Sequence, residues 1–274
     1  MFANKVKKVA AIHDLSGMGR VSLTVVIPIL SSMGFQVCPL PTAILSNHTQ
    51  YPDFTFLDLT DEMPRIIAEW KRLEVEFDAI YTGYLGSPRQ IQIVSDFIRD
   101  FRRKDSLTVI DPVLGDNGKL YSNFNESMVV EMQHLVTHAD VITPNLTELF
   151  YLLDRPSKRV FALFVGQRAG SGHYHQCTGV GRTPQNFCLC LQSDRKPLLE
   201  NHMSLFARPL SGYGRYVYEC HYRSFIALDR ATQFILQGIR ATFGYEYDNR
   251  EGILLEKVLH NLDMPIQSSS YELI

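Results

Sequence analysis

Short apolar segments alternate with helical patterns through the first 156 residues, and this alternation is what most constrains the fold. The segments that predict strands, rich in Val, Ile or Tyr, are 6–12, 36–45, 79–85, 107–114 and 139–143. Residues 63–75 and 90–102 place apolar side chains three to four residues apart, as amphipathic helices do. Strands separated by crossover helices favour a mainly parallel sheet covered on both faces. We therefore expect a three-layer α/β/α fold.

Two helix starts carry a recognisable signal. Ser87 is followed by Pro88 and, three residues on, by Gln90, which is typical of a capping box with proline at the first helical position. Asn145 is followed by Glu148, so the Asn can cap the helix while the Glu reaches back to it. Both signals predict that a helix follows a loop at these positions.

Polar residues follow each expected strand. They lie in the segments 13–20, 46–51, 82–84, 111–118 and 143–148. Single residues among them have ordinary explanations, since Gly17 can simply make a turn and Tyr84 can simply pack. Together they are more informative, because ligands of open parallel sheets bind at the carboxyl ends of the strands. Asp111 and Asp116 can hold a hydrated Mg²⁺, which needs only one or two carboxylates beside phosphates, and phosphoryl transfer suits such a site.

The composition is that of a globular protein. A length of 274 residues and 45% hydrophobic content allow a full core, and we expect a single domain spanning 1–274. The net charge of -2 gives no sign of nucleic-acid or membrane partners. The amino-terminal segment does not resemble a signal peptide, so we expect a cytoplasmic protein. Outside residues 157–224 the only cysteine is Cys38, which fits a reducing compartment.

Residues 157–224 differ from their surroundings. The segment shows neither strand nor helix periodicity, is basic, and contains four of the five cysteines. A zinc-binding insert is one interpretation, with ligands drawn from His173, His175, Cys177, Cys188 and Cys190. The CxC spacing fits this poorly, because structural zinc sites usually pair CxxC or CxxxxC motifs.

Two motifs carry a family resemblance. DPVLGDNGKLY, starting at Asp111, followed by TPNLTELFYLL, starting at Thr143, resembles the ribokinase-like superfamily of small-molecule kinases. SNHTQY, starting at Ser46, narrows the resemblance to the pyridoxal kinase family. Hydroxymethylpyrimidine kinases share the DPV and TPN elements and remain the alternative. The resemblance covers residues 1–156 and resumes at about residue 227, in all roughly three quarters of the chain.

The resemblance implies roles for particular residues. It implies ATP-dependent phosphorylation of the 5'-hydroxymethyl group of pyridoxal and related B6 vitamers by a Mg²⁺-requiring homodimer. The implied substrate-binding residues are Asp14, Ser16, His48, Thr49 and Tyr84. The implied ATP-binding residues are Asp111, Thr143, Asn145 and Glu148, and those that organise Mg²⁺ are Asp116, Thr143 and Glu148.

One element of the family pattern is missing. The family opens a late helix with Gly-Thr-Gly-Asp, whose backbone N–H groups hold the transferring phosphate while the Asp accepts the proton of the substrate hydroxyl. No such sequence occurs in this chain. Suitable synonymous codons for residues 210–224, read one nucleotide later, give YPGTGDTFTSVITG, which places the expected Asp near Gly214 and Arg215.

This alternative reading suggests a frameshift. The same offset yields strand-like runs from residues 166–201, in the family's order. We therefore interpret 157–224 as a frameshifted part of a pyridoxal kinase, bounded by an indel near 157–165 and another near 225. As written, the chain is expected to be inactive or nearly so. A non-catalytic pyridoxal-binding protein is a further alternative, and it predicts binding without turnover.

Overall fold

The computed structural model describes residues 6–153, 191–192, 230–231, 233–245 and 248–263 of the chain. The strands are β1 (Lys8–Met18), β2 (Gln36–Asn47), β3 (Phe56–Asp58), β4 (Ala79–Thr82), β5 (Leu107–Ile110), β6 (Gly115–Asp116), β7 (Lys119–Leu120), β8 (Val141–Ile142) and β9 (Leu191–Gln192). The labelled α-helices of the described residues are α1 (Leu23–Ser32), α2 (Met63–Arg72), α3 (Pro88–Phe101), α4 (Glu126–Val136) and α5 (Leu146–Leu152), and residues 233–242 are helical as well. Three short 3-10 helices follow, namely η3 (Asn249–Glu251), η4 (Leu255–Lys257) and η5 (Leu259–Asp263).

Apart from residues 191–192, the segment 157–224 lies outside the described residues. The zinc-insert and frameshift hypotheses concern this segment, so both stay predictions.

Within the described residues, seven strands form one sheet in the order β3-β2-β1-β4-β5-β8-β9. The pairs β1–β2, β1–β4, β4–β5 and β5–β8 are parallel, while β3 and β9 join antiparallel at the two edges. This arrangement confirms the expected mainly parallel sheet. β1 lies between β2 and β4, so its carboxyl end lies beside the loops that follow both neighbours.

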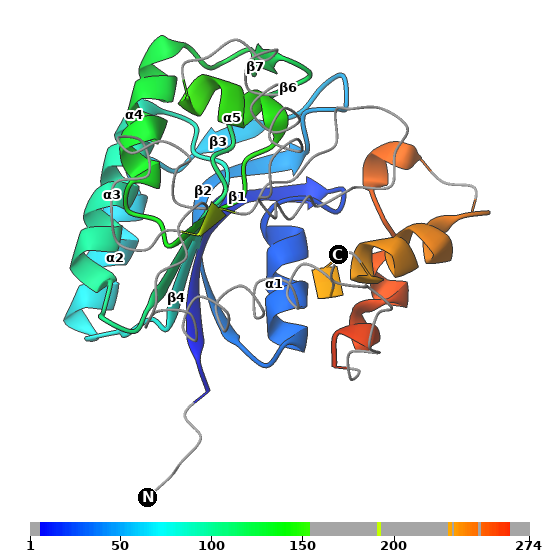
Figure 1. Cartoon of the computed structure of the whole chain (residues 1–274), viewed down its shortest axis with the longest axis horizontal. Coiled ribbons are helices and arrows are strands. Elements are labelled where there is room, and N and C mark those ends of the chain that lie inside the picture. The colour runs from blue at the N-terminus through cyan, green and yellow to red at the C-terminus, as the bar shows by residue number, and fades with distance from the viewer. Residues whose placement is uncertain (1–5, 154–190, 193–229, 232, 246–247, 264–274) are drawn as a thin grey trace, which may run out of the picture.

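Helices cover both faces of the sheet (Figure 1). Helices α2, α3 and α4 lie together on one face, and α1 lies on the other with the carboxyl-terminal segment beside it. Helix α1 contacts both β1 and η5. The three layers predicted from the alternation of strands and helices are therefore present in the described residues.

Two of the expected strands are longer than predicted. β1 was predicted to end at residue 12 but runs to Met18, and β2 runs to Asn47, because the two strands keep pairing as far as the Met18–Asn47 pair. Residues 13–18, expected in a loop, therefore belong to a strand. The pairing shifts between His13 and Leu15, a bulge that locally re-aims the side chains beside it.

The two capping signals have different outcomes. At α5 the box is complete, since the Asn145 side chain accepts from the Glu148 N–H and the Glu148 carboxylate accepts from the Asn145 N–H. At α3 the Ser87 hydroxyl accepts from the Gln90 N–H as predicted, at 3.2 Å. The return bond is different, because the Gln90 side-chain oxygen accepts from the N–H of Gly86, at 2.8 Å. The side chain of Gln90 thus fixes the backbone of Gly86, the residue before the helix cap.

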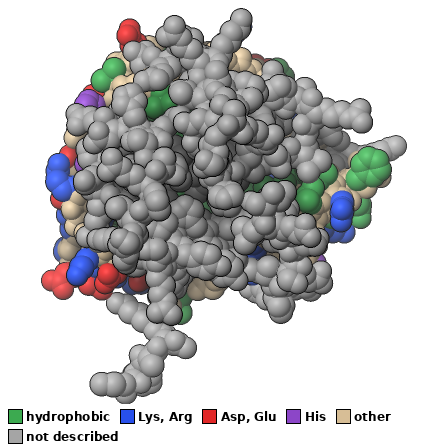
Figure 2. All heavy atoms as spheres, viewed as in Figure 1, with side chains coloured by type: hydrophobic (Ala, Val, Ile, Leu, Met, Phe, Trp, Pro, Cys, Tyr) green, Lys and Arg blue, Asp and Glu red, His purple; other side chains and the backbone are tan. Residues whose placement is uncertain are grey.

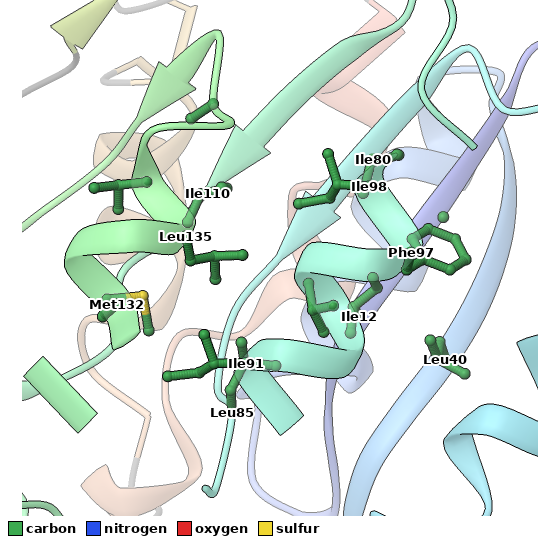
Figure 3. Packing of buried hydrophobic residues seen from close by; sticks show 14 of the residues in the cluster. Ile12, Leu40, Ile80, Leu85, Ile91, Phe97, Ile98, Ile110, Met132 and Leu135 are labelled. Atoms are coloured by element: carbon green, nitrogen blue, oxygen red, sulfur yellow. The ribbon is translucent and has the colours of Figure 1, made fainter. Parts of the chain in front are cut away.

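The main core lies between the sheet and the helices α3 and α4 (Figure 3). Isoleucines 12, 80 and 110 come from adjacent strands β1, β4 and β5, and each is fully buried. Phe97 of α3 is 1% exposed and contacts the rings of Phe77, Phe101 and Trp70. This packing holds β1, β4 and β5 in register, and their carboxyl ends carry the candidate site.

The outer surfaces of α2 and α3 carry charges of both signs (Figure 2). Three pairs have i,i+3 spacing, namely Arg65–Glu62, Arg72–Glu69 and Arg99–Asp96. Such exposed pairs contribute little stability and mainly keep the surface hydrated. Within the described residues, each helix is too short or too polar to traverse a lipid bilayer.

We predict that Phe97→Ala lowers the free energy of unfolding by about 3–5 kcal/mol, because it removes a buried ring and leaves a cavity. Phe243→Ala is the matched control, since that ring is 89% exposed and its loss should change stability little. Urea denaturation of both variants measures the difference. Equal losses would show that the ring cluster around Phe97 is not a core.

Candidate active site

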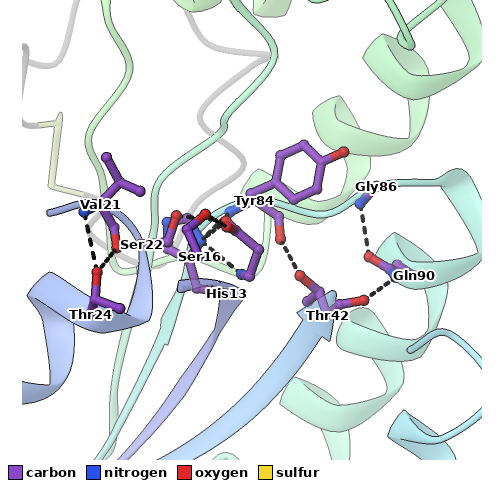
Figure 4. A network of polar contacts seen from close by, with 10 residues as sticks. His13, Ser16, Val21, Ser22, Thr24, Thr42, Tyr84, Gly86 and Gln90 are labelled. Atoms are coloured by element: carbon purple, nitrogen blue, oxygen red, sulfur yellow. Dashed lines mark hydrogen bonds and ion pairs between the residues drawn. The ribbon is translucent and has the colours of Figure 1, made fainter. Parts of the chain in front are cut away.

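A buried carboxylate, Asp14, lies near the carboxyl end of β1. The Ser22 hydroxyl donates to its Oδ1 at 2.7 Å and the Ser16 hydroxyl donates to its Oδ2 at 3.1 Å. The ring nitrogen Nδ1 of His13 lies 2.8 Å from Oδ1. Figure 4 shows His13, Ser16 and Ser22 gathered at this end of β1, with Tyr84 next to them. Asp14 and Ser16, both predicted to bind substrate, are therefore brought together.

Hydrogen bonding keeps Asp14 ionised in spite of its burial. Burial alone would raise the pKa of this carboxyl group, but the hydrogen bonds and charge of His13, together with the Ser22 and Ser16 hydroxyls, lower the pKa below its ordinary value. Ser22 takes part although its φ of 56° is unusual for a residue other than glycine. The sequence motif gave no hint of Ser22, because a serine before a helix is expected to cap that helix.

Tyr84 lies after β4 and contacts His13 of the Asp14 group. Its N–H donates to His13 Nδ1 at 3.3 Å, and its carbonyl accepts from the Thr42 hydroxyl at 2.9 Å. Its phenol oxygen accepts from the Asn123 amide at 2.9 Å, and its ring stacks on Phe124 with centroids 5.8 Å apart. The ring is thus held in one orientation next to the Asp14 group.

His48 and Thr49 follow β2 but make other contacts. His48 Nε2 donates to the carbonyl of Arg250, and the N–H of Gln50 donates to Nδ1 at 3.4 Å, so the proton of the ring is on Nε2. A side chain at Gly19, where φ is +93°, would place its Cβ 2.3 Å from the His48 ring. Thr49 is exposed. Among the described residues, neither His48 nor Thr49 hydrogen bonds to Asp14 or Tyr84.

The carboxyl-terminal segment closes over the loop that follows β1. The N–H of Arg20 donates to the carbonyl of Glu251 at 3.0 Å, and its guanidinium pairs with the carboxylate of Glu256, also at 3.0 Å. The guanidinium of Arg250 lies 4.5 Å from the centre of the Tyr51 ring. Sequence reasoning missed these contacts, because they join residues more than 190 positions apart.

Asp111 follows β5 and is joined to the loop that follows β8. The Thr143 hydroxyl donates to its Oδ1 at 3.3 Å. Burial raises the pKa of Asp111 to about 6, while the charge of His13 and the Thr143 hydrogen bond act in the opposite direction. Because β1, β4 and β5 are adjacent parallel strands, the Asp14 group and Asp111 lie at the same edge of the sheet.

Glu148 forms a second buried acid near Asp111. Its oxygens accept from the N–H groups of Leu114 at 3.3 Å and Asn145 at 2.7 Å. Burial, followed by repulsion from Asp111, raises the pKa of Glu148 to about 8. Two buried carboxyl groups close together repel each other when both are ionised. A bound cation would relieve this repulsion, so the pair suits a site that binds a metal ion with phosphate.

Asn145 and Asp116 occupy different surroundings. The Asn145 side chain caps α5 and also donates to the carbonyl of Gly115 at 2.9 Å, so both ends of its amide are engaged within the protein. Asp116 is exposed and accepts from the N–H of Asn117 at 2.7 Å. No group of three or more metal-ligating side chains is found within the part of the chain that the structure describes.

Comparison with known proteins identifies the family. A family model described as phosphomethylpyrimidine kinase matches residues 32–162. A crystal structure from Bacteroides thetaiotaomicron, named as a phosphomethylpyrimidine kinase, is 62% identical, covers 100% of this chain and 100% of that chain, and has a TM-score of 0.75. The chain belongs to the family of phosphomethylpyrimidine and pyridoxal kinases. This confirms the resemblance found in the sequence motifs.

Other members of the family extend the comparison. A second crystal form of the Bacteroides thetaiotaomicron protein, with pyridoxal, is 63% identical, covers 98% of this chain and 100% of that chain, and has a TM-score of 0.76. Pyridoxal kinase PdxY of Pasteurella multocida is 32% identical over 131 residues, which are 45% of this chain and 45% of that protein. The chain spans about half the length of the curated relatives it matches.

The raised pKa of Glu148 predicts a dependence of stability on pH. Between the ordinary pKa of 4.5 and the folded value of about 8, the folded protein keeps a proton that the unfolded chain has released. Stability therefore falls as pH rises through this range, and Asp111 acts in the same direction up to about pH 6. Glu148→Gln should flatten the fall, as measured by urea denaturation from pH 5 to 8.

Glu126→Gln is the control, because Glu126 is exposed in the first turn of α4. Its free energy of unfolding should change with pH in parallel with that of the parent protein. If the free energy of unfolding of Glu148→Gln fell with pH as steeply as that of the parent, this would contradict our conclusion that Glu148 is protonated in the folded protein.

Proposed function

We propose that this chain is built as a pyridoxal kinase, with a site that binds B6 vitamers and transfers a phosphoryl group from ATP to their 5'-hydroxymethyl group. The observation that carries the proposal is the ionised Asp14, held by Ser16 and Ser22 beside the ring of Tyr84. The related protein crystallised with pyridoxal is 63% identical, which supports the same ligand class here.

The chemistry of this site suits a polar aromatic ring. Asp14 offers a fixed negative charge to a donor on the pyridine, and Ser16 offers a hydroxyl. Tyr84 offers an aromatic ring that its stacking on Phe124 already orients. His48 and Thr49 belong to the proposed site through the SNHTQY motif. Because His48 is held by Arg250, the motif would be presented as one rigid unit.

The nucleotide would lie on the Asp111 side of the site. Crystal structures of Leishmania donovani pyridoxal kinase in complex with ADP, one of them 26% identical with a TM-score of 0.52, support nucleotide use in the family. Thr143, Asn145 and Glu148 belong to this part of the proposal. Because this side adjoins the Asp14 group, the donor and the acceptor of the phosphoryl group would lie at one edge of the sheet.

The residues present fit a Mg²⁺ ion. Burial and repulsion raise the pKa values of Asp111 and Glu148, and a nearby cation would relieve that repulsion. Mg²⁺ needs only one or two carboxylates when phosphates and water supply the other oxygens. Asp116, Thr143 and Glu148 would hold it, as the family resemblance implies. When bound, the ion would neutralise charge on the nucleotide phosphates.

The transfer step lacks its proton acceptor in the chain as written. No Gly-Thr-Gly-Asp occurs in the sequence, and the segment that should contain it lies outside the described residues. The proposal is therefore that the chain as written retains ligand binding, and that transfer belongs to the in-frame form. As the family resemblance implies, the proposal also includes a cytoplasmic location and a homodimeric assembly.

Phosphorylation of a hydroxymethylpyrimidine is the second candidate. The description of the matching family model favours it. The ring contacts proposed for Asp14 also suit an aminopyrimidine, because that ring presents hydrogen-bond donors as well. Comparing the affinities for pyridoxal and hydroxymethylpyrimidine decides between the two, and the proposal expects tighter binding of pyridoxal.

We predict that Asp14→Asn weakens pyridoxal binding by about 10- to 100-fold, because it removes a charge-assisted hydrogen bond. Asp53→Asn is the control, since Asp53 is exposed and its side chain lies outside the site. Isothermal titration calorimetry of the ligand-free protein gives both affinities. Unchanged binding by Asp14→Asn would remove the observation on which the proposed function rests.

A repaired chain tests the missing transfer step. We expect protein of the verified 31.3 kDa mass to phosphorylate pyridoxal at least about 10³-fold more slowly than a chain whose segment 157–224 is restored to the alternative frame. A coupled assay for ADP release measures both. Comparable turnover by the two proteins would show that the element is not required.

Intact mass settles the status of the frameshift. If purified protein from the original gene has a mass that matches the 31.3 kDa sequence, the segment is present in the protein. A different mass, equal to that of the in-frame chain, would show that the protein itself is intact.

A further inference from the structure

His13 occupies the centre of the site, although neither a sequence motif nor the family resemblance assigns it a role. The residue is 9% exposed. The N–H groups of Asp14 and Tyr84 point at its Nδ1, at 3.0 and 3.3 Å, and Asp14 Oδ1 lies 2.8 Å from the same atom. Without a proton Nδ1 accepts from these N–H groups, and with a proton it donates to the carboxylate instead. One nitrogen atom thus joins the carboxylate that follows it on β1 to the residue that follows β4 (Figure 4).

The backbone around the ring is shaped to hold it. A Cβ added to Gly83 would lie 1.9 Å from His13 Cδ2 and 2.2 Å from Nε2, so any larger residue there would displace the imidazole. The N–H of Gly83 donates to the carbonyl of Ile12 at 2.8 Å, which brings β1 and the end of β4 together next to the ring. The backbone of Gly83 therefore restricts the imidazole to one position.

The ring also influences both acids of the site. Its charge and hydrogen bond favour the ionised form of Asp14, and its charge favours the ionised form of Asp111. His13 is thus placed between the proposed vitamer-binding and nucleotide-binding halves.

We propose that His13 is a positioning residue for vitamer binding, which fixes the Asp14 carboxylate and the Tyr84 backbone relative to each other through Nδ1. The proposal rests on the proposed function for its ligand, while its geometric part can be tested without any ligand. His13 acts through Asp14 and Tyr84 and does not itself need to touch the vitamer.

Two substitutions separate the polar contact from the bulk of the ring. His13→Leu fills a similar volume without a polar atom. His13→Asn restores one, because the side-chain oxygen of Asn is as many bonds from Cα as Nδ1 is in His. His134→Leu is the control, since His134 is exposed on α4.

Amide hydrogen exchange in the ligand-free protein tests the geometric part. In His13→Leu we expect the Tyr84 N–H to exchange about tenfold faster than in the parent, because it loses its acceptor. The Gly83 N–H, bonded to Ile12, is the internal reference and should stay within about twofold. His13→Asn should return Tyr84 toward the parent rate. An unchanged rate for Tyr84 in His13→Leu would overturn the proposal whether or not pyridoxal binds.

Pyridoxal affinity tests the functional part. We expect His13→Leu to weaken binding about tenfold or more, His13→Asn to stay within about threefold of the parent, and His134→Leu to leave it unchanged. Faster Tyr84 exchange with unchanged affinity would overturn the proposal, because the ring would then be purely structural. If the parent fails to bind pyridoxal, the proposed function fails, and the exchange rates still decide whether His13 positions Asp14 and Tyr84.

A variant of Gly83, the residue that follows β4, covers the case in which His13→Leu does not fold. Gly83→Ala should displace the imidazole and weaken pyridoxal binding in the same way. Adding His13→Asn to Gly83→Ala should restore binding, because the smaller side chain leaves room for the methyl group. Loss of binding in both Gly83 variants would contradict the proposed contact.

Discussion

The whole site depends on the pairing of β1 with β2 on one side and β4 on the other. β1 continues along β2 as far as Met18, which places Asp14 and Ser16 beyond the point where β4 ends at Thr82. The chain that follows β4 then turns across the end of β1 and brings Tyr84 onto His13. The buried isoleucines of β1, β4 and β5 keep these strand ends level with one another.

The electrostatics of this edge follow from burial. Asp14 is buried with enough donors to remain ionised, whereas Asp111 and Glu148 are buried with fewer donors and lie close together. Asp14 is therefore suited to accept a hydrogen bond from a neutral or cationic ring. The other two are suited to a site that gains positive charge with its ligand. This division is what the proposed function requires, with the vitamer on the Asp14 side and the nucleotide on the Asp111 side.

The sequence predicted the parts of the structure that local chemistry specifies. The parallel sheet follows from apolar strand segments, and the cap of α5 follows from Asn145 and Glu148. Helix α1 was not predicted, because it begins without a side-chain cap and contains Pro28. The return bond of Gln90 to Gly86 and the contacts of Arg20 with residues 251 and 256 were also missed. The Arg20 contacts depend on how distant segments meet, which a single sequence does not encode locally. The Gln90 bond is local, but it replaces the return bond that the capping-box pattern predicts.

The central claim is that the vitamer ring binds between Asp14 and Tyr84. Crystals of the ligand-free chain soaked with pyridoxal would test this most directly. We expect electron density for the ring against Tyr84, with a polar ring substituent within hydrogen-bond distance of Asp14 or Ser16. Density elsewhere on the protein, with the Asp14 group unoccupied at a saturating concentration, would contradict the account.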